Sequence, residues 1–246
     1  PDGQLRYIPL AALHDGNQWL VETYRINNIT ARSLTDFAPR STQKLRVIAA
    51  AATKSQKVGN ISFNALPATT TEVESIASQI SNTTSLIDRD FTKIALEPKL
   101  NTHTIVHLAT HGHFAIGQPE QSFILYGNGD AATLRDMGNW TLTNVNLVIL
   151  SACQTALSGK IGNGSGIEIL GLGYQIQKAG AGASIASLWK VDDSGTQALM
   201  TAFYDQLKQG NIPPAEALRR SQIHLIKSNL NHPFYWSAFI LIGNGF

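Results

Sequence analysis

Short apolar runs alternate with amphipathic segments from residue 45 to the end of this chain, and this alternation narrows its possible folds. Residues 47–51 (Val-Ile-Ala-Ala-Ala) form an apolar run that ends in polar Thr53, which is typical of a strand buried on both faces. Comparable strand-length runs occupy residues 85–87, 104–108, 147–150, 184–188 and 239–242. Strands that alternate with helices predict an α/β fold, with a mostly parallel sheet and helices on both of its faces.

Helical spacing characterises the segments between these runs. Apolar side chains recur on one face in residues 73–80, 166–178, 195–208 and 213–225. Thr69 and Glu72, three residues apart, predict a capping box at the start of the first helix. Pro213 and Pro214 suit the first turn of the last helix.

The first 35 residues show a weaker pattern. Residues 6–10, 19–21 and 24–26 alternate enough to predict strands or a lead-in to the domain. We therefore expect residues 1–246 to form a single domain, with 1–44 as an N-terminal segment packed on it. The sequence opens Pro-Asp-Gly without Met or a signal-like stretch, so we expect it to be the C-terminal part of a longer protein.

Composition excludes several classes of protein. Of the 246 residues, 43% are hydrophobic and 15% charged, which is enough apolar material for a buried core. The net charge is only +2 and no basic run is interleaved with aromatics, so no nucleic acid is expected as a direct partner. One cysteine allows neither an internal disulfide nor a thiolate-rich zinc site, and a cytoplasmic location is expected. No apolar stretch is long enough for a membrane span.

Two predicted strands end in residues that can do chemistry. The run 104–108 is followed closely by His111 and Gly112, and the run 147–150 is followed by Cys153, 153 − 111 = 42 residues later. Parallel sheets place ligand chemistry at the carboxyl ends of their strands. A neighbouring imidazole lowers the pKa of a thiol or removes its proton during attack, and later protonates the leaving amine. Glycine after the histidine lets a substrate carbonyl approach the backbone.

Each of these residues also has a plainer interpretation. A lone cysteine in an apolar strand can be a small buried hydrophobe, and a histidine at a strand end can be structural. Spacing alone leaves both interpretations open.

Other polar features give weaker signals. The glycine-rich residues 162–166 lack the Lys-Ser/Thr that completes a phosphate-binding loop, so a loop beside the nucleophile is the better interpretation. His103, His107 and His113 come without a carboxylate cluster at ligand spacing, so no metal is expected. Trp189 and Trp236 are expected either in the core or as walls of a substrate cleft.

Five stretches of the chain carry a family resemblance. They are residues 109–114 (Ala-Thr-His-Gly-His-Phe), 150–156 (Leu-Ser-Ala-Cys-Gln-Thr-Ala), 187–193 (Ser-Leu-Trp-Lys-Val-Asp-Asp), 200–204 (Met-Thr-Ala-Phe-Tyr) and 232–239 (His-Pro-Phe-Tyr-Trp-Ser-Ala-Phe). Together with the opening residues 1–10, they resemble the CHAT domain, whose members are caspase-like cysteine peptidases related to caspases and separase. The resemblance covers essentially the whole chain.

This resemblance implies a caspase-like three-layer sandwich and a cysteine endopeptidase without a cofactor. It implies that His111 is the general base and acid, that Cys153 is the nucleophile, and that the N–H groups of Gly112 and Cys153 form the oxyanion hole. CHAT domains usually follow tetratricopeptide or other repeat modules, so the expected partners are a protein substrate and such modules or a regulatory protein. The alternative is a signalling or interaction module that keeps the fold with little or no cleavage. A third reading, a nucleotide-binding protein, lacks a phosphate loop.

The sequence around the nucleophile departs from the caspase signature. Caspases have Gln-Ala-Cys-x-Gly, whereas this chain has Ser-Ala-Cys-Gln-Thr at residues 151–155. The departure argues against cleavage after aspartate. Ser151 stands where some relatives have an acidic group that binds substrate, and Asp192 and Asp193 can supply that charge instead, which predicts cleavage after Arg or Lys. The alternative is that Asp193 or Ser194 caps a helix that begins near residue 195.

Overall fold

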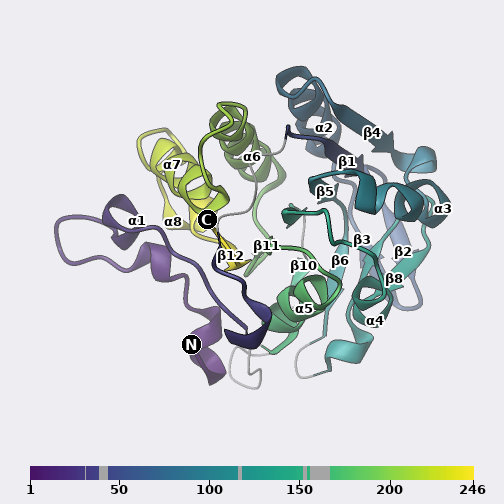
Figure 1. Cartoon of the computed structure of the whole chain (residues 1–246), viewed down its shortest axis with the longest axis horizontal. Coiled ribbons are helices and arrows are strands. Elements are labelled where there is room, and N and C mark those ends of the chain that lie inside the picture. Colours follow the sequence, from purple (N-terminus) through teal and green to yellow (C-terminus); the bar gives the residue numbers. More distant parts are fainter. Residues whose placement is uncertain (31, 39–43, 116–117, 152–153, 156–166) are drawn as a thin grey trace.

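The computed structural model describes residues 1–246 except 31, 39–43, 116–117, 152–153 and 156–166. At its centre is a six-stranded sheet (Figure 1). In spatial order its strands are β12 (Phe239–Gly243), β11 (Ala183–Ser187), β9 (Leu147–Leu150), β5 (Ile105–Ala109), β1 (Val47–Ala51) and β4 (Thr83–Ile87). Every pairing is parallel except that of β12 with β11. The structure therefore confirms the predicted α/β fold with a mostly parallel sheet.

Both faces of the sheet are covered, which explains why its strands are apolar throughout. Every residue of β1 is buried, with Val47, Ala49 and Ala51 in one core cluster and Ile48 and Ala50 in the other. Successive side chains of a strand point to opposite faces, so a strand between two helical layers needs apolar residues at every position.

Helices form the two outer layers. One core cluster joins the sheet to α2 (Ala68–Gln79), α6 (Asp193–Leu207) and α7 (Pro214–Ile226). The other joins it to α3 (Lys93–Leu96), α4 (Leu134–Gly138) and α5 (Ile167–Lys178). The result is the expected three-layer sandwich. No helix in the described part of the chain combines the length and apolar character that a bilayer crossing requires.

Two small sheets lie outside the central one. A four-stranded sheet has the order β10 (Gln154–Thr155), β6 (Gly112–Phe114), β7 (Phe123–Leu125) and β8 (Ala131–Thr133), and a hairpin joins β2 (Gln56–Val58) to β3 (Ile61–Phe63). We did not predict these strands, because two or three residues are too few to show a period of two. They matter for function because β6 begins directly after His111 and β3 ends in Phe63, whose ring lies against that of His111.

Of the two alternatives for the N-terminal segment, strands or a lead-in to the domain, the strands are wrong. This segment contains two turns of 3₁₀ helix, η1 (Gly3–Tyr7) and η2 (Leu10–Ala12), and the short helix α1 (Leu20–Thr23), and residues 24–26 lie in no helix or strand. In the described part of this segment, a parallel bridge between Asn28 and Ile242 reaches the central sheet. A short apolar segment stays extended only when it pairs with a neighbouring strand over several residues, and this segment has no such pairing in the described residues. That residues 1–246 form a single domain stays a prediction.

Two predicted helix starts also need correction. Helix α2 begins at Ala68, before the proposed capping box: the Thr69 hydroxyl donates to the Leu66 carbonyl, and the Glu72 carboxylate is buried against His107. Helix α6 begins at Asp193, two residues before the expected start. The remaining helical segments are α8 (Pro233–Trp236), η3 (Arg32–Leu34), η4 (Asp88–Asp90), η5 (Glu97–Thr102) and η6 (Pro119–Gln121).

Candidate active site

His111 lies just beyond the carboxyl end of β5, where the chain leaves the central sheet and enters β6. Its side chain is buried. Strand β9, which is followed by Cys153 in the sequence, pairs with β5 in parallel, with Leu150 opposite Leu108. The two strands that were predicted to carry the site are therefore neighbours, and their carboxyl ends lie on the same edge of the sheet.

A backbone carbonyl orients the His111 imidazole. The Nε2 atom lies 3.0 Å from the carbonyl oxygen of Lys54. A carbonyl can only accept a hydrogen bond, so Nε2 carries the proton and the neutral ring keeps a lone pair on Nδ1. The Phe63 ring packs against the imidazole, with 5.2 Å between ring centroids. The imidazole is thus held in one orientation, with Nδ1 as its basic atom.

The surroundings of His111 favour its neutral form. Burial lowers its pKa, because the imidazolium loses hydration, and the positive charge of Lys190 lowers it further. The bond to the Lys54 carbonyl and the negative charge of Asp193 act in the opposite direction but do not outweigh burial. A neutral imidazole at pH 7 can accept a proton.

Cys153 itself lies outside the described residues, but the backbone on both sides of it is placed. Before it, the Ser151 N–H donates to the Leu108 carbonyl at 3.1 Å. After it, Gln154 pairs in parallel with His113, as part of β10 beside β6 (Figure 1). The residues that flank Cys153 therefore pair with the segments directly before and after His111. The thiol–imidazole pair and the oxyanion contribution of Cys153 stay predictions.

Gly112 is buried in β6, and close packing is sufficient to explain why it is glycine. A Cβ at this position would lie 3.0 Å from the Phe114 ring and 3.7 Å from the Ile124 side chain. This is tighter than ordinary van der Waals contact, so a larger residue would have to displace the ring. The oxyanion role of Gly112 stays a prediction beside this packing role.

The two aspartates of the predicted substrate site have different environments. Asp192 is exposed and caps α6: its Oδ2 accepts hydrogen bonds from the N–H groups of Ser194 (3.1 Å) and Gly195 (3.3 Å) and from the Ser194 hydroxyl. The prediction that Asp193 or Ser194 caps this helix was therefore wrong, because Asp192 is the capping residue. Asp193 is partly buried and accepts a 2.8 Å hydrogen bond from the Ala68 N–H, at the start of α2. Burial raises the pKa of Asp193, while His111 lowers it.

Ser151 is buried at the end of β9, and its Oγ has no hydrogen-bond partner among the described residues. Of the two tryptophans predicted to lie in the core or in a substrate cleft, Trp236 belongs to the core. Trp189 is half-buried and stacks on Phe234, with 6.4 Å between ring centroids. Trp189 can therefore form part of a surface cleft, whereas Trp236 cannot.

The other three histidines considered as metal ligands have separate partners. His113 lies beside Phe123, with 5.4 Å between ring centroids. His103 contacts Thr84 and Lys99, whereas His107 is buried between Glu72 and Tyr204. Within the described ranges, no group of three or more His, Cys, Asp or Glu residues could hold a metal ion. Sequence reasoning missed the Lys54 carbonyl, because every residue carries one. It missed Phe63 because the hairpin strands are too short to detect.

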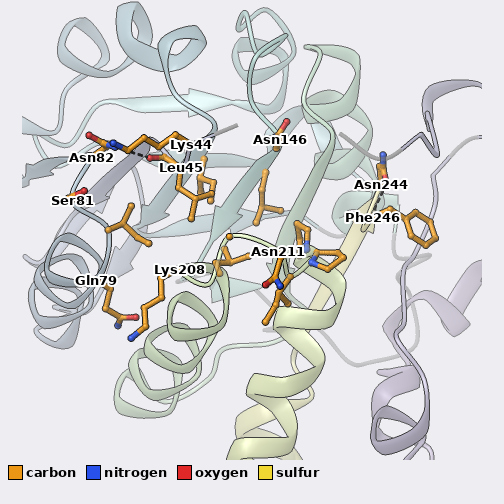
Figure 2. Close-up of a pocket in the computed structure, with 18 residues that line it drawn as sticks. Lys44, Leu45, Gln79, Ser81, Asn82, Asn146, Lys208, Asn211, Asn244 and Phe246 are labelled. Atoms are coloured by element: carbon orange, nitrogen blue, oxygen red, sulfur yellow. Dashed lines mark hydrogen bonds between the residues drawn. The ribbon is translucent and has the colours of Figure 1, made fainter. Parts of the chain in front are cut away.

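A cavity of about 500 Å³ lies at the opposite edge of the sheet (Figure 2). Ile105 and Leu147, the first residues of β5 and β9, contribute to its lining. These two residues are apolar. The polar residues that line the cavity include the side-chain amides of Asn82 and Asn211 and the lysine Lys208. Because parallel strands place His111 at their other ends, this cavity is separate from the candidate active site.

Comparisons with known proteins identify a family. The family model of the CHAT domain matches residues 1–244. No curated protein matches the chain. Two structures of one protein are similar to this chain. The Arg specific cysteine proteinase gingipain R (RgpB) has a TM-score of 0.53 at 10% identity, over 90% of this chain and 49% of the other. The complex of the pro- and mature domains of RgpB from Porphyromonas gingivalis has a TM-score of 0.50 at 11% identity, over 92% of this chain and 51% of the other. The separase–securin complex of Saccharomyces cerevisiae has a TM-score of 0.48 at 10% identity, over 82% of this chain and 12% of the other. The chain thus spans about half the length of the gingipain chains, and the likeness at this identity concerns the fold.

Proposed function

Because this chain belongs to the CHAT domain family, we propose that it is a cysteine endopeptidase with His111 and Cys153 as its catalytic dyad. The observation that carries the proposal is the His111 imidazole, buried, neutral and held through Nε2 by the Lys54 carbonyl. The backbone flanking Cys153 supports it. Ser151 and Gln154 both pair with the chain around His111, and only two residues lie between them.

In this mechanism Nδ1 of His111 takes the proton of the Cys153 thiol as Sγ attacks the substrate carbonyl carbon. The N–H groups of Gly112 and Cys153 stabilise the resulting oxyanion. The C–N bond then breaks, and the imidazolium gives its proton to the leaving amine. Water hydrolyses the thioester with His111 again acting as base, which releases the carboxylic acid and restores the thiol.

For substrate specificity we propose cleavage after Arg or Lys. Asp193 supports this preference better than Asp192, because Asp193 is partly buried and its negative charge acts on His111, whereas Asp192 is exposed. The fold neighbour gingipain R is Arg specific, which is compatible with a basic residue before the cut bond. Ser151 is proposed to face the same side chain from the end of β9.

We further propose that the domain has a low basal activity, which a partner raises. His111 is only 2% exposed, so a substrate reaches its imidazole only after neighbouring residues move. The proposed partners are a protein substrate and N-terminal repeat modules of the tetratricopeptide type or a regulatory protein, in the cytoplasm. The same burial favours, as a second candidate, a module that keeps the fold without efficient cleavage.

The test uses the only cysteine of the sequence as its own probe. Iodoacetamide alkylation, followed by mass spectrometry, reports the reactivity of the Cys153 thiol directly, even where peptide cleavage is weak. We expect rapid alkylation near pH 7, slowed about tenfold or more in His111→Gln, because the unassisted thiol has a pKa of about 8.5. Equal alkylation rates in the two proteins would contradict the dyad.

Fluorogenic peptides that vary the residue before the cut bond test the activity and its specificity. We expect cleavage after Arg or Lys by the parent and none by Cys153→Ala. In Asp193→Asn, kcat/KM for Arg peptides should fall about tenfold or more relative to peptides with a neutral residue at that position. Asp192→Asn is the matched control and should keep the preference. A preference unchanged in both variants would refute the acidic subsite, and alkylation without cleavage would favour the second candidate.

A further inference from the structure

The Lys54 carbonyl that orients His111 belongs to a loop, which we call the 53–66 loop after its residues. The loop follows β1, contains the β2–β3 hairpin, and closes where the Leu66 N–H donates to the Thr53 carbonyl at 2.8 Å. It contacts the imidazole twice, through the Lys54 carbonyl and through the Phe63 ring. Whatever fixes the start of this loop therefore fixes the orientation of His111.

Asp88 fixes the start of the loop. It follows β4, and its Oδ1 accepts a hydrogen bond from the Thr53 N–H at 2.8 Å. The Thr53 hydroxyl lies 2.9 Å from both carboxylate oxygens. Lys54 Nζ lies 3.6 Å from Oδ2, but the Lys54 side chain is 69% exposed, so this ion pair contributes little. The carboxylate thus holds the residue directly before the carbonyl that contacts His111.

The backbone of Asp88 is unusual in a way that points to this role. With φ of 49°, it is in the left-handed region, and no other non-glycine residue in the described part of the chain has a positive φ. Residues held in this region are strained, and they cluster at functional sites. The neighbouring Gly127 makes room for it, since a Cβ there would lie 2.0 Å from the Asp88 carbonyl oxygen.

We infer that Asp88 is a positioning residue for the His111–Cys153 dyad. Its carboxylate fixes the Thr53–Lys54 backbone so that the Lys54 carbonyl accepts from Nε2 of His111 and leaves Nδ1 basic. The inference deepens the proposed peptidase function and rests on it for its catalytic consequence. The orientation of His111 can be measured without any activity.

The charge that this role requires is present at neutral pH. Burial raises the pKa of Asp88, but the hydrogen bonds from Thr53 and the nearby Lys54 outweigh it, and the net effect lowers the pKa below its usual value. A carboxylate accepts hydrogen bonds more strongly than a neutral amide does. Removing the charge of Asp88 should therefore disturb the orientation of His111 less than removing its whole side chain.

The experiment measures the His111 tautomer by long-range ¹H–¹⁵N NMR of protein labelled at histidine, with His111→Gln to assign the signal. In the parent we expect the Nε2–H form. Asp88→Gly keeps a residue suited to the left-handed backbone and removes the carboxylate, so the ring should become a mixture of tautomers. Asp88→Asn, which retains one acceptor, should lie between the two. If Asp88→Gly does not fold, the Asn variant still decides between an altered and an unaltered tautomer.

Asp136→Ala is the matched control. Asp136 holds Thr133 in the same way, accepting from its N–H at 2.8 Å and from its hydroxyl at 2.7 Å, but at the start of α4. This variant should lose stability and keep the parental His111 tautomer. An Nδ1–H tautomer in the parent, or a tautomer unchanged in both Asp88 variants, would overturn the inference.

Peptide cleavage adds the catalytic readout and separates the two proposals. We expect kcat to fall about tenfold or more in Asp88→Gly while KM changes less than about twofold, because the variant affects proton transfer rather than binding. A parent without peptidase activity whose tautomer still depends on Asp88 would refute the proposed function and retain the positioning role. An active parent with unchanged tautomer and kcat in the Asp88 variants would refute only the positioning role.

Discussion

Burial keeps three histidines of this protein in their neutral form. It lowers the pKa of His103, His111 and His113, because the charged ring would lose hydration. In His103 both nitrogens have partners: Nδ1 lies 3.0 Å from the Lys99 carbonyl and Nε2 lies 3.1 Å from the Thr84 hydroxyl. Since a carbonyl only accepts, Nδ1 carries the proton and Nε2 accepts from Thr84. A second proton would bind to Nε2, which could then no longer accept the hydrogen bond from Thr84.

These lowered pKa values predict that the protein loses stability in mild acid. As pH falls below about 6.5, the unfolded chain binds protons before the folded protein does. The contribution of these histidines to the free energy of unfolding should therefore be complete above this pH. It should decline as pH falls toward the lower pKa of the folded histidines. Urea denaturation at pH 7.5, 6.5 and 5.5 measures the decline. In His103→Gln it should be shallower, and an equally steep decline in this variant would contradict the prediction.

Asp193 has the opposite effect on the free energy of unfolding in acid. Its pKa is raised in the folded protein, so the folded protein binds this proton before the unfolded chain does. Its contribution is the same in the parent and in His103→Gln, so the difference between them isolates the histidine.

Residue-scale features differed in how far the sequence reveals them. His111 could be placed at a strand end because an apolar run, the histidine and a glycine follow one another in the chain. The hydrogen-bond partner of its Nε2 could not be predicted, because this partner is a backbone carbonyl and every residue has one. Asp88 was equally hidden, since its role depends on a left-handed backbone and on Thr53, 35 residues before it.

Between the elements, a buried cluster joins α2, β5 and α6. The Glu72 carboxylate lies 2.7 Å from His107 Nε2, and the Tyr204 hydroxyl lies 3.2 Å from His107 Nδ1. All three side chains are buried. The second oxygen of Glu72 has no hydrogen-bond partner in the described part of the chain. Removing one member would leave its partners buried without their polar contact, which is costly.

This cluster predicts strong coupling between α2 and β5. Glu72→Leu and His107→Leu should each lower the free energy of unfolding by about 3–5 kcal/mol, because each leaves a buried polar partner unmatched. The double variant should lose clearly less than the sum of the two, because both polar groups are then replaced by apolar ones. Urea denaturation of the four proteins completes the cycle. Additive losses would show that the two residues do not act as a pair.

At this scale the sequence reveals long elements better than short ones. The strand β1 could be predicted from its continuous run of five apolar residues, and the helices α6 and α7 because they are long enough to display their period. The capping box failed because Glu72 has the spacing of a cap but packs inward against His107. The β6–β8 sheet has strands of three residues, which is below the length at which alternation is informative.

Across the whole molecule, the N-terminal segment covers one edge of the central sheet. The Asn28 N–H donates to the Leu241 carbonyl at 2.8 Å, and the Gly243 N–H donates to the Asn28 carbonyl at 2.7 Å. Strand β12 is otherwise the last strand of the sheet on this side. An exposed strand edge is a template for pairing with another chain, so this bridge protects the molecule.

Deleting residues 1–35 should uncover that edge. Hydrogen exchange of the Gly243 amide should become faster, because its acceptor on Asn28 is lost, while the amides of β1 and β5 in the middle of the sheet keep their protection. Backbone-resolved exchange by NMR measures both sets. Exchange at Gly243 as slow as in the parent would show that another group protects the edge.

The strand order has a further consequence for how the molecule is made. Starting from β1 and β4, the sheet extends outward through β5, β9, β11 and β12, which is also their order along the chain. On the ribosome, each strand can therefore dock onto a template that is already complete, without waiting for a later one. The residues before β1 are the exception: their acceptor and donor lie on β12, which is synthesised after the other strands of this sheet, so these residues emerge before β1 but pair with the sheet after it.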